Sequence, residues 1–509
     1  MPTLRSLSNG APLIYRLTRW VASLSLRLFY RRIDAINLHN LPSTGPVVLA
    51  ANHPNYIIDA LAIAIQTGRH IHFVGKGPLV DRWPVLSPFL RKIGVIPIYR
   101  PSDDPHRQHD NRGSYDRCAE HLETGGIICM FSEGRSHPDP HVRELRTGTA
   151  RIVLETEARS GYRLGVQVVP VGLFFPEEDR YFTDGVVVFG KPILLDPFCA
   201  QHRDRPGHAV RALTKAIQAD LRHLTLHLPD PAWASFVDQM HDLIRWGDDV
   251  PPSEALHLRQ RISTATENFR DREPYQAQTC RDQLDDLWQR SEAWRRHQLP
   301  QADPIAQRRS ISRRLRDAVA LPLATVGFTY HAIPYLIPKL WARYLVPSRE
   351  KKAFIKFLIG APVFVTWYGL TFRALDRRSS SLAYAWTAVG PLTGLLALRS
   401  RAHRRRWFDA WRNPRSATHT RLGARIAADR AALLETFVPW LDAAGTPHPE
   451  PEPSIPGTLH RSAGGRPYRR CRLDPRWPPH ETTRLKSYRQ TQPSLILRRA
   501  STPSPHSRL

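Results

Sequence analysis

Between residues 46 and 193, short runs of Val, Ile and other apolar residues alternate with longer segments in which apolar residues recur at helical spacing. Continuous apolar runs of this kind are typical of strands that are buried on both faces of a sheet. Their alternation with helices predicts an α/β fold with a mostly parallel sheet flanked by helices. The predicted strands cover 47–51, 70–75, 95–99, 127–131, 166–171 and 186–189.

A histidine and an aspartate follow the first of these strands. His53 lies in a predicted loop after 47–51, and Asp59 lies early in the apolar helix that comes next. Asp59 can then accept a hydrogen bond from one ring nitrogen of His53 while the other nitrogen faces a substrate hydroxyl. An aspartate that only caps the helix would explain the same pattern.

Polar residues also follow later strands of the predicted sheet. Arg100 ends the stretch at 94–100, and Glu133 and Gly134 lie in the stretch at 131–137. Since α/β proteins place their sites at the carboxyl ends of parallel strands, we expect these strand ends to converge on the pocket beside the first histidine. Lys76, just past another strand, faces either this pocket or the solvent.

These stretches together resemble the glycerol-phosphate and lysophosphatidate acyltransferase family, whose motifs occur here in the same order over residues 45–195. The family's motifs are Asn-His followed by Asp, then Gly-x-Ile-x-x-x-Arg, then Phe-Pro-Glu-Gly. Five residues separate His53 from Asp59, which resembles the branch with fungal-type glycerol-3-phosphate and dihydroxyacetone-phosphate acyltransferases. Tyr56 and Ser132 depart from this pattern, which has Ser and Pro at those places.

The resemblance implies an O-acyltransferase of phospholipid biosynthesis. It would move a fatty acyl group from acyl-CoA or an acyl carrier protein to the hydroxyl of glycerol-3-phosphate or dihydroxyacetone phosphate, with lysophosphatidate as the alternative acceptor. By the same resemblance, His53 is the general base, Asp59 orients it, and Arg100 binds the acceptor phosphate. The residues expected to bind substrate are Asn55, Lys76, Arg100, Glu133 and Gly134. No cofactor is implied.

Charge points to an anionic partner. The chain has 73 Lys and Arg against 46 Asp and Glu, a net charge of +27, which favours phospholipid surfaces, nucleic acid or acidic carrier proteins. We expect anionic membrane lipid and no nucleic acid, because the Arg-rich tail lacks regularly spaced aromatic residues. A non-catalytic scaffold that binds such partners is the remaining alternative, although it would have no need of the residues named above.

A metal site is not expected. His70 and His72 alternate along a predicted strand like two metal ligands, but the sequence offers no third ligand nearby.

Residues 1–45 contain a predicted helix with apolar and arginine residues at helical spacing. The apolar residues are Leu13, Leu17, Trp20, Val21, Leu24 and Leu28. This pattern fits a helix that lies in a membrane interface, and it fits equally a helix packed on the protein's own core. The predicted catalytic domain at 46–200 follows, and then a helical accessory region at 201–310.

Three uncharged stretches lie at 318–338, 357–372 and 379–398, within a predicted membrane-associated region. A membrane-spanning helix needs about 20 apolar residues. Because cations follow 318–338, the positive-inside bias predicts that this stretch is interfacial or re-entrant, that the other two form a membrane hairpin, and that the catalytic domain is cytoplasmic. A shallow hairpin that never crosses is the alternative.

The remaining boundaries follow from composition. The membrane-associated region is expected at 311–400, a basic helical segment at 401–445 and a disordered tail at 446–509. The tail is rich in Pro and Arg and poor in apolar residues that could offset its ordering entropy.

Overall fold

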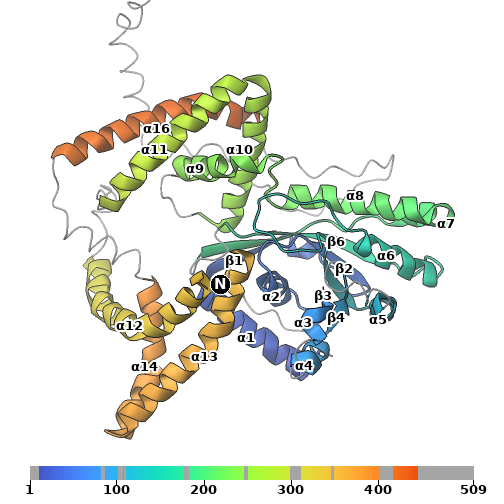
Figure 1. Cartoon of the computed structure of the whole chain (residues 1–509), viewed down its shortest axis with the longest axis horizontal. Helices are drawn as coiled ribbons and strands as arrows, with labels where there is room; N and C mark the ends of the chain where they lie inside the picture. Colours follow the sequence, from blue (N-terminus) through green and yellow to red (C-terminus); the bar gives the residue numbers. More distant parts are fainter. Residues whose placement is uncertain are drawn as a thin grey trace, which may run out of the picture. The chain divides into compact units, whose positions relative to one another are not determined.

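The computed structural model describes residues 11–81, 86–100, 107, 110–176, 183–245, 250–297, 311–344, 349–399 and 417–444 (Figure 1). The predicted tail at 446–509 and residues 401–416 of the predicted basic segment lie outside the described residues.

The N-terminal half of the chain contains a sheet of seven strands within the described residues, in the order β1-β7-β6-β2-β5-β3-β4. All neighbouring strands are parallel except β6 and β7, which are antiparallel. The strands are β1 (Tyr30–Ile36), β2 (Val47–Ala51), β3 (Ile71–Lys76), β4 (Val95–Ile98), β5 (Ile127–Phe131), β6 (Gln167–Phe174) and β7 (Thr183–Phe189). The prediction of a mostly parallel sheet is confirmed, and each predicted strand overlaps an observed one.

Helices cover both faces of this sheet, which explains why the strands are apolar on both sides. In β2, Val47 and Leu49 pack into one core with α1 (Leu13–Phe29) and α2 (Ile57–Gln66). Val48 and Ala50 pack into the other core with α5 (Asn111–Glu123), α6 (Gly148–Arg159), α7 (Asp196–Asp204) and α8 (Pro206–Leu224). The short helices α3 (Gly77–Asp81) and α4 (Leu86–Lys92) lie between β3 and β4 in the chain.

The N-terminal segment supplies a strand that the sequence did not predict. β1 lies inside the predicted lead-in at 1–45 and pairs with β7 at one edge of the sheet. Helix α1 packs on the core through one face, with Ala22 and Leu26 buried. Its other face exposes apolar side chains, among them Leu13 at 79% and Trp20 at 55% of their surface. One face of α1 therefore packs on the protein's own core, as one alternative predicted. The exposed apolar face fits the other alternative, a helix that lies in a membrane interface.

A third hydrophobic core lies in the accessory helices. It joins α9 (Ala234–Arg245), α10 (Pro252–Arg272) and α11 (Pro274–His297) with α16 (Ala417–Ala443). Phe236 and Phe269 both lie edge-on to Phe437 of α16. Their ring centroids lie 5.6 and 6.4 Å, respectively, from that of Phe437. The sequence analysis placed 201–310 and 401–445 in separate regions, whereas helices from both share this core.

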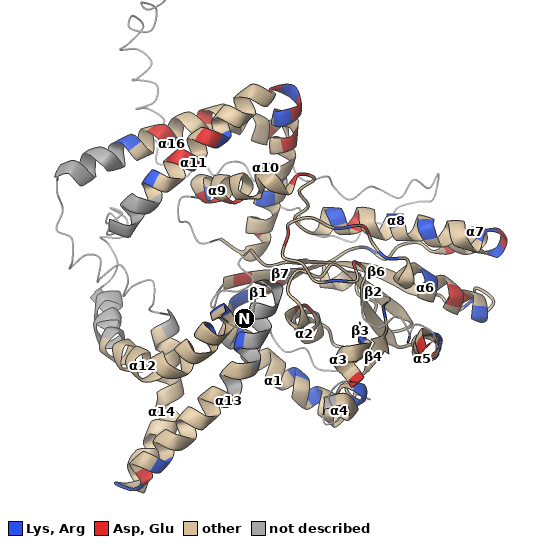
Figure 2. Cartoon of the chain, viewed as in Figure 1, with Lys and Arg blue, Asp and Glu red and all other residues tan. Residues whose placement is uncertain are grey.

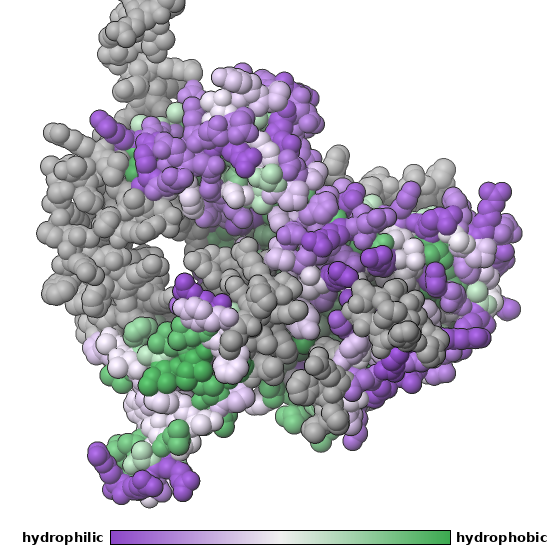
Figure 3. Space-filling view, in the orientation of Figure 1, coloured by the Kyte–Doolittle hydropathy of each residue, from purple (hydrophilic) through white to green (hydrophobic). Residues whose placement is uncertain are grey.

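The helices α12 (Ile311–Tyr344), α13 (Arg349–Asp376) and α14 (Ser380–Arg399) pack together with polar groups inside and apolar groups outside. Tyr330 donates to Thr371 at 2.9 Å, and His331 is hydrogen-bonded to Tyr368 at 2.7 Å. Leu, Ile and Val side chains of these helices are exposed. Residues 322–338, 357–372 and 380–398 contain no Lys, Arg, Asp or Glu, and hydrophobic side chains gather over these helices (Figures 2 and 3).

None of the helices in the described part of the chain combines the length and the hydropathy of a membrane span. The predicted membrane hairpin at 357–372 and 379–398 is therefore not confirmed. Thr, Tyr, Trp and Gly residues interrupt the apolar side chains along α13 and α14 and lower their mean hydropathy.

Candidate active site

The loop between β2 and α2 carries His53, and neighbouring elements hold this loop at several points. Asn52 Nδ2 donates to the Leu173 carbonyl at 3.0 Å, and the Leu173 N–H donates to Asn52 Oδ1 at 2.7 Å. The Tyr56 N–H donates to the Ser136 hydroxyl at 2.9 Å. Tyr56 has a φ of 50°, which is uncommon for a residue other than glycine. Contacts to β6 and to the loop after β5 therefore fix the loop.

His53 and Asp59 form a hydrogen-bonded pair. Asp59 lies in the first turn of α2 with its side chain fully buried, and its Oδ2 lies 2.8 Å from His53 Nδ1. The Asn55 N–H donates to the same oxygen at 2.7 Å. Because a carboxylate only accepts hydrogen bonds, we assign the hydrogen of His53 to Nδ1, which leaves Nε2 able to accept a proton. Burial raises the pKa of Asp59, and the hydrogen bond from His53 opposes this rise.

Packing also fixes the direction of the His53 ring. The ring stacks on Phe131 at the end of β5, with centroids 3.9 Å apart and an interplanar angle of 16°. The side chain keeps 14% of its surface exposed and lines a cavity. Asp59 of α2 thus holds the imidazole at its edge, and Phe131 of β5 supports its face.

The cavity beside His53 has a volume of about 1410 Å³, above the range of about 300–1,000 Å³ of most small-molecule pockets. Its wall includes apolar side chains, among them Ala22, Ile57, Leu61, Phe73, Val80, Leu90 and Ile93. It also includes cationic side chains, among them Lys76, Arg100, Arg112, Arg135, Arg146 and Arg151. Such a wall fits a ligand with one apolar part and one anionic part.

Arg100 reaches this wall because its neighbours hold the end of β4. The side chain of Asn111 in α5 accepts from the Tyr99 N–H at 2.8 Å and donates to the Tyr99 carbonyl at 2.7 Å. The sequence prediction that the ends of β2, β4 and β5 converge agrees with this geometry, since His53, Arg100 and Gly134 line the same cavity.

Two of the residues predicted to bind substrate face the protein instead. Asn55 is fully buried, and its Nδ2 donates to the Tyr30 hydroxyl at 2.7 Å. Glu133 is buried as well, and its Oε1 accepts from the His53 N–H at 3.0 Å. Gly134 beside it does line the cavity, in a turn whose φ of 75° favours glycine. Lys76, Arg100 and Gly134 thus lie in the cavity wall, whereas the side chains of Asn55 and Glu133 bind other protein groups.

Comparison with known proteins agrees with this geometry. Residues 32–173 match the acyltransferase family model. These residues thus form an acyltransferase domain, and its motifs are similar to those of the glycerol-phosphate and lysophosphatidate acyltransferase family. A glycerol-3-phosphate O-acyltransferase 2 of Saccharomyces cerevisiae is 30% identical over 122 residues, which cover 24% of this chain and 16% of that protein.

Two further proteins are similar to parts of the chain. An uncharacterised acyltransferase of Schizosaccharomyces pombe is 21% identical over 305 residues, which cover 43% of this chain and 45% of that protein. The crystal structure of a 1-acyl-sn-glycerophosphate acyltransferase from Thermotoga maritima matches 41% of this chain and 77% of that chain, with 17% identity and a TM-score of 0.30. The chain therefore spans less than half the length of the curated relatives it matches.

The acyltransferase domain also contains supporting residues that sequence reasoning missed. Arg19 of α1 is buried and donates to the carbonyls of Ala64, Ile65 and Thr67 at 2.7 to 3.0 Å, at the C-terminal end of α2. A cation there satisfies carbonyls that the helix leaves open. Arg19 is one of several arginines in a predicted interfacial helix, so its spacing could not distinguish it from a lipid-facing residue.

Two arginines in the cavity wall, Arg135 and Arg146, were not predicted as site residues either. Arg135 lies in the stretch at 131–137, which carries a family motif, and Arg146 lies shortly after it in the sequence. Their positions next to Gly134 and before α6 were the available signal.

A separate cluster of histidines lies near the start of β3 in the acyltransferase domain. His72 stacks on His121 with ring centroids 3.6 Å apart, and His70 lies edge-on to His72 at 4.7 Å. No group of three or more possible metal ligands has a metal-binding arrangement within the residues that the structure describes.

Proposed function

We propose that the chain is an O-acyltransferase that moves a fatty acyl group from acyl-CoA or an acyl carrier protein to the hydroxyl of glycerol-3-phosphate or dihydroxyacetone phosphate. One observation carries this proposal. His53, which is paired with Asp59, lines a cavity whose wall contains both apolar and cationic side chains. The name of the S. cerevisiae relative favours glycerol-3-phosphate as the acceptor.

In this reaction His53 is the general base. Its Nε2 takes the proton of the acceptor hydroxyl while the hydroxyl oxygen attacks the thioester carbonyl. The tetrahedral intermediate then collapses, the carbon–sulfur bond breaks, and the proton passes from His53 to the leaving thiolate. The products are an ester and a free thiol. Asp59 stabilises the imidazolium that forms between these steps.

The cavity wall would hold the two substrates in different ways. Arg100 binds the acceptor phosphate, because the planar guanidinium can donate two parallel hydrogen bonds to phosphate oxygens. Lys76 supports an anionic group nearby, Gly134 allows close approach of substrate to the backbone, and the apolar wall takes the acyl chain. Asn55 and Glu133 act through the protein: each holds the loop that carries His53.

Purified full-length chain, tested with two donors and three acceptors, examines this proposal. The donors are palmitoyl-CoA and palmitoyl acyl carrier protein, and the acceptors are glycerol-3-phosphate, dihydroxyacetone phosphate and lysophosphatidate. We expect equal amounts of thiol and ester with at least one of the first two acceptors, and product formation slower by about 100-fold or more with the His53→Ala variant. Product from lysophosphatidate alone would change the acceptor assignment, and no product from any pair would contradict the proposed activity.

The acyltransferase would work at an anionic membrane surface, with its catalytic domain on the cytoplasmic side. The exposed apolar face of α1 and the exposed apolar side chains of α12–α14 support the proposed contact with a membrane surface, as does the net charge of +27. Flotation with vesicles of phosphatidylcholine, with and without phosphatidylglycerol, tests it. Binding should require the anionic lipid, weaken with added salt, and weaken when Leu17 and Trp20 are both replaced by Glu.

A further inference from the structure

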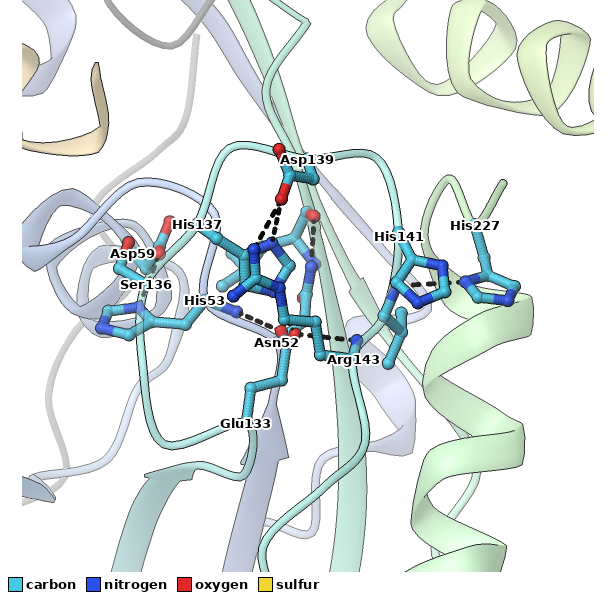
Figure 4. Close-up of polar contacts among 12 residues, drawn as sticks. Asn52, His53, Asp59, Glu133, Ser136, His137, Asp139, His141, Arg143 and His227 are labelled. Carbon is cyan, nitrogen blue, oxygen red and sulfur yellow. Dashed lines mark hydrogen bonds and ion pairs between the residues drawn. The ribbon is translucent and has the colours of Figure 1, made fainter. Parts of the chain in front are cut away.

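A buried histidine, His137, lies in the loop after β5, next to the backbone of His53. His137 follows Glu133 by four residues, and its Nε2 is hydrogen-bonded to Glu133 Oε2 (Figure 4). Because the carboxylate only accepts, Nε2 of His137 carries the hydrogen. The ring is 8% exposed and the Glu133 side chain is 2% exposed. His137 is absent from the cavity wall formed by the described residues.

The Glu133 carboxylate gathers three donors. Its Oε1 accepts from the His53 N–H at 3.0 Å, and its Oε2 accepts from the Arg143 N–H at 3.1 Å and from His137. The backbone N–H of His137 in turn donates to the His53 carbonyl at 3.0 Å. Both backbone groups of His53 are therefore bonded to the Glu133–His137 unit.

The segment that carries His137 is anchored at its far end as well. The Leu228 N–H donates to the Pro140 carbonyl at 2.8 Å, and the Val142 N–H donates to His227 Nδ1 at 3.0 Å. His141 Nδ1 lies 3.0 Å from the Leu228 carbonyl, and Leu228 belongs to the core of the accessory helices. The segment between His137 and Arg143 thus connects the backbone of His53 to the accessory region.

We propose that His137 is a positioning residue for the His53 base, acting through Glu133, in the reaction proposed above. A buried carboxylate that loses a donor must rearrange or take up water, because an unsatisfied buried charge is strongly unfavourable. Either change moves the peptide of His53, whose amide the same carboxylate holds. The ring would then leave the position set by Asp59 and Phe131, while the substrate-binding wall stays in place.

Three single variants of the full-length chain test this role. His137→Phe keeps the ring shape and removes the donor, while His137→Gln returns an N–H donor near the Nε2 position. His202→Phe is the matched control, since His202 is another buried histidine, 3.0 Å from the Tyr162 hydroxyl and remote in sequence from the catalytic loop. Each is measured for kcat, for the KM of donor and acceptor, and for Tm.

We expect His137→Phe to lower kcat by about 10- to 100-fold, because a displacement of about 1 Å in a catalytic group costs up to that factor. Both KM values should stay within a few-fold of the parent values. His137→Gln should recover most of the lost kcat, and His202→Phe should keep the parent kcat. If His137 only supports the fold, His137→Phe should behave like His202→Phe: Tm falls, and the kcat of the folded enzyme is unchanged.

Hydrogen–deuterium exchange of the peptide that covers 52–59 gives a readout without activity. The amides of His53, Asn55 and Tyr56 all donate hydrogen bonds in the structure. Exchange there should accelerate in His137→Phe, return toward the parent rate in His137→Gln, and stay at the parent rate in His202→Phe. Parent kcat and parent exchange in His137→Phe would overturn the proposal, as would a His137→Gln variant as impaired as His137→Phe. If the parent itself transfers no acyl group, the proposed function fails, and the exchange rates still decide the role of His137.

Discussion

Histidines lie at the carboxyl edge of the central sheet, where its parallel strands end, and at the amino edge, where these strands begin. The two groups of histidines have different neighbours. At the carboxyl edge, His53 follows β2, bonds to the buried carboxylate of Asp59 and lines the cavity. At the amino edge, His72 lies in β3 between the rings of His70 and His121. Burial and these neighbouring histidines lower the pKa of His72 to about 3.

This difference shows how the same side chain acquires different roles on one scaffold. The hydrogen bond to the Asp59 carboxylate fixes the orientation of the His53 ring beside the cavity, which supports the general-base role proposed for it. Burial beside other imidazoles disfavours the charged form of His72, so its neutral ring acts as a packing group. We therefore expect changes at the carboxyl edge to alter turnover, and changes at the amino edge to alter stability.

The strongest test of this contrast removes the base. His53→Ala should lower kcat by about 100- to 10,000-fold, the usual contribution of general-base catalysis, with little change in Tm. His72→Phe should keep kcat near the parent value. Steady-state kinetics and thermal unfolding of both variants measure the difference, and near-normal turnover in His53→Ala would contradict the mechanism.

A smaller loss should follow when the partner of the base changes. Asp59→Asn keeps the size of the side chain and removes the charge that stabilises the imidazolium, so kcat should fall by about 100-fold, near the lower end of the same range. Circular dichroism and the kcat of the variant check this. If Asp59→Asn has the parent kcat, the orienting group must be sought elsewhere.

The acceptor assignment predicts an effect on KM that only one acceptor should show. Arg100→Lys keeps the charge and loses the two-pronged geometry, so the KM for glycerol-3-phosphate should rise by about tenfold, since one charge-assisted hydrogen bond contributes about 1.5 to 3 kcal/mol. The KM of the donor should hardly change. Plain glycerol, which has no phosphate, should be a poor acceptor for parent and variant alike. Equal losses with both acceptors would mean that Arg100 supports the donor or the fold.

The smallest effect concerns the amino edge and acid. The pKa of His72 in the folded chain, about 3, lies below the ordinary value of 6.5. The unfolded chain therefore binds the proton first as pH falls below about 6.5, so folding stability is lost between that pH and the folded pKa. Burial also lowers the pKa values of His70 and His121. His72→Phe should consequently reduce, without abolishing, the fall in Tm between pH 7 and pH 5, and an unchanged slope would contradict this role.

The local pattern of the sequence determined most of the catalytic domain. Apolar runs predicted the strands from β2 to β7, and the spacing of His53 and Asp59 placed the pair at a strand end and in the first turn of a helix. Both are short-range properties, because strand and helix periods are written in neighbouring residues. β1 was missed, since its sequence YRRIDAI at an edge strand lacks a continuous apolar run.

Only the tertiary structure decided which way the polar side chains point and which distant segments meet. Glu133 and Gly134 are neighbours in one motif, yet Glu133 turns inward to the backbone of His53 while Gly134 lines the cavity. Phe437 joins the core of Phe236 and Phe269, more than 150 residues away in the sequence. The sequence fixes the type and spacing of such residues, but their direction depends on burial and on hydrogen-bond partners that folding brings together from separate parts of the chain.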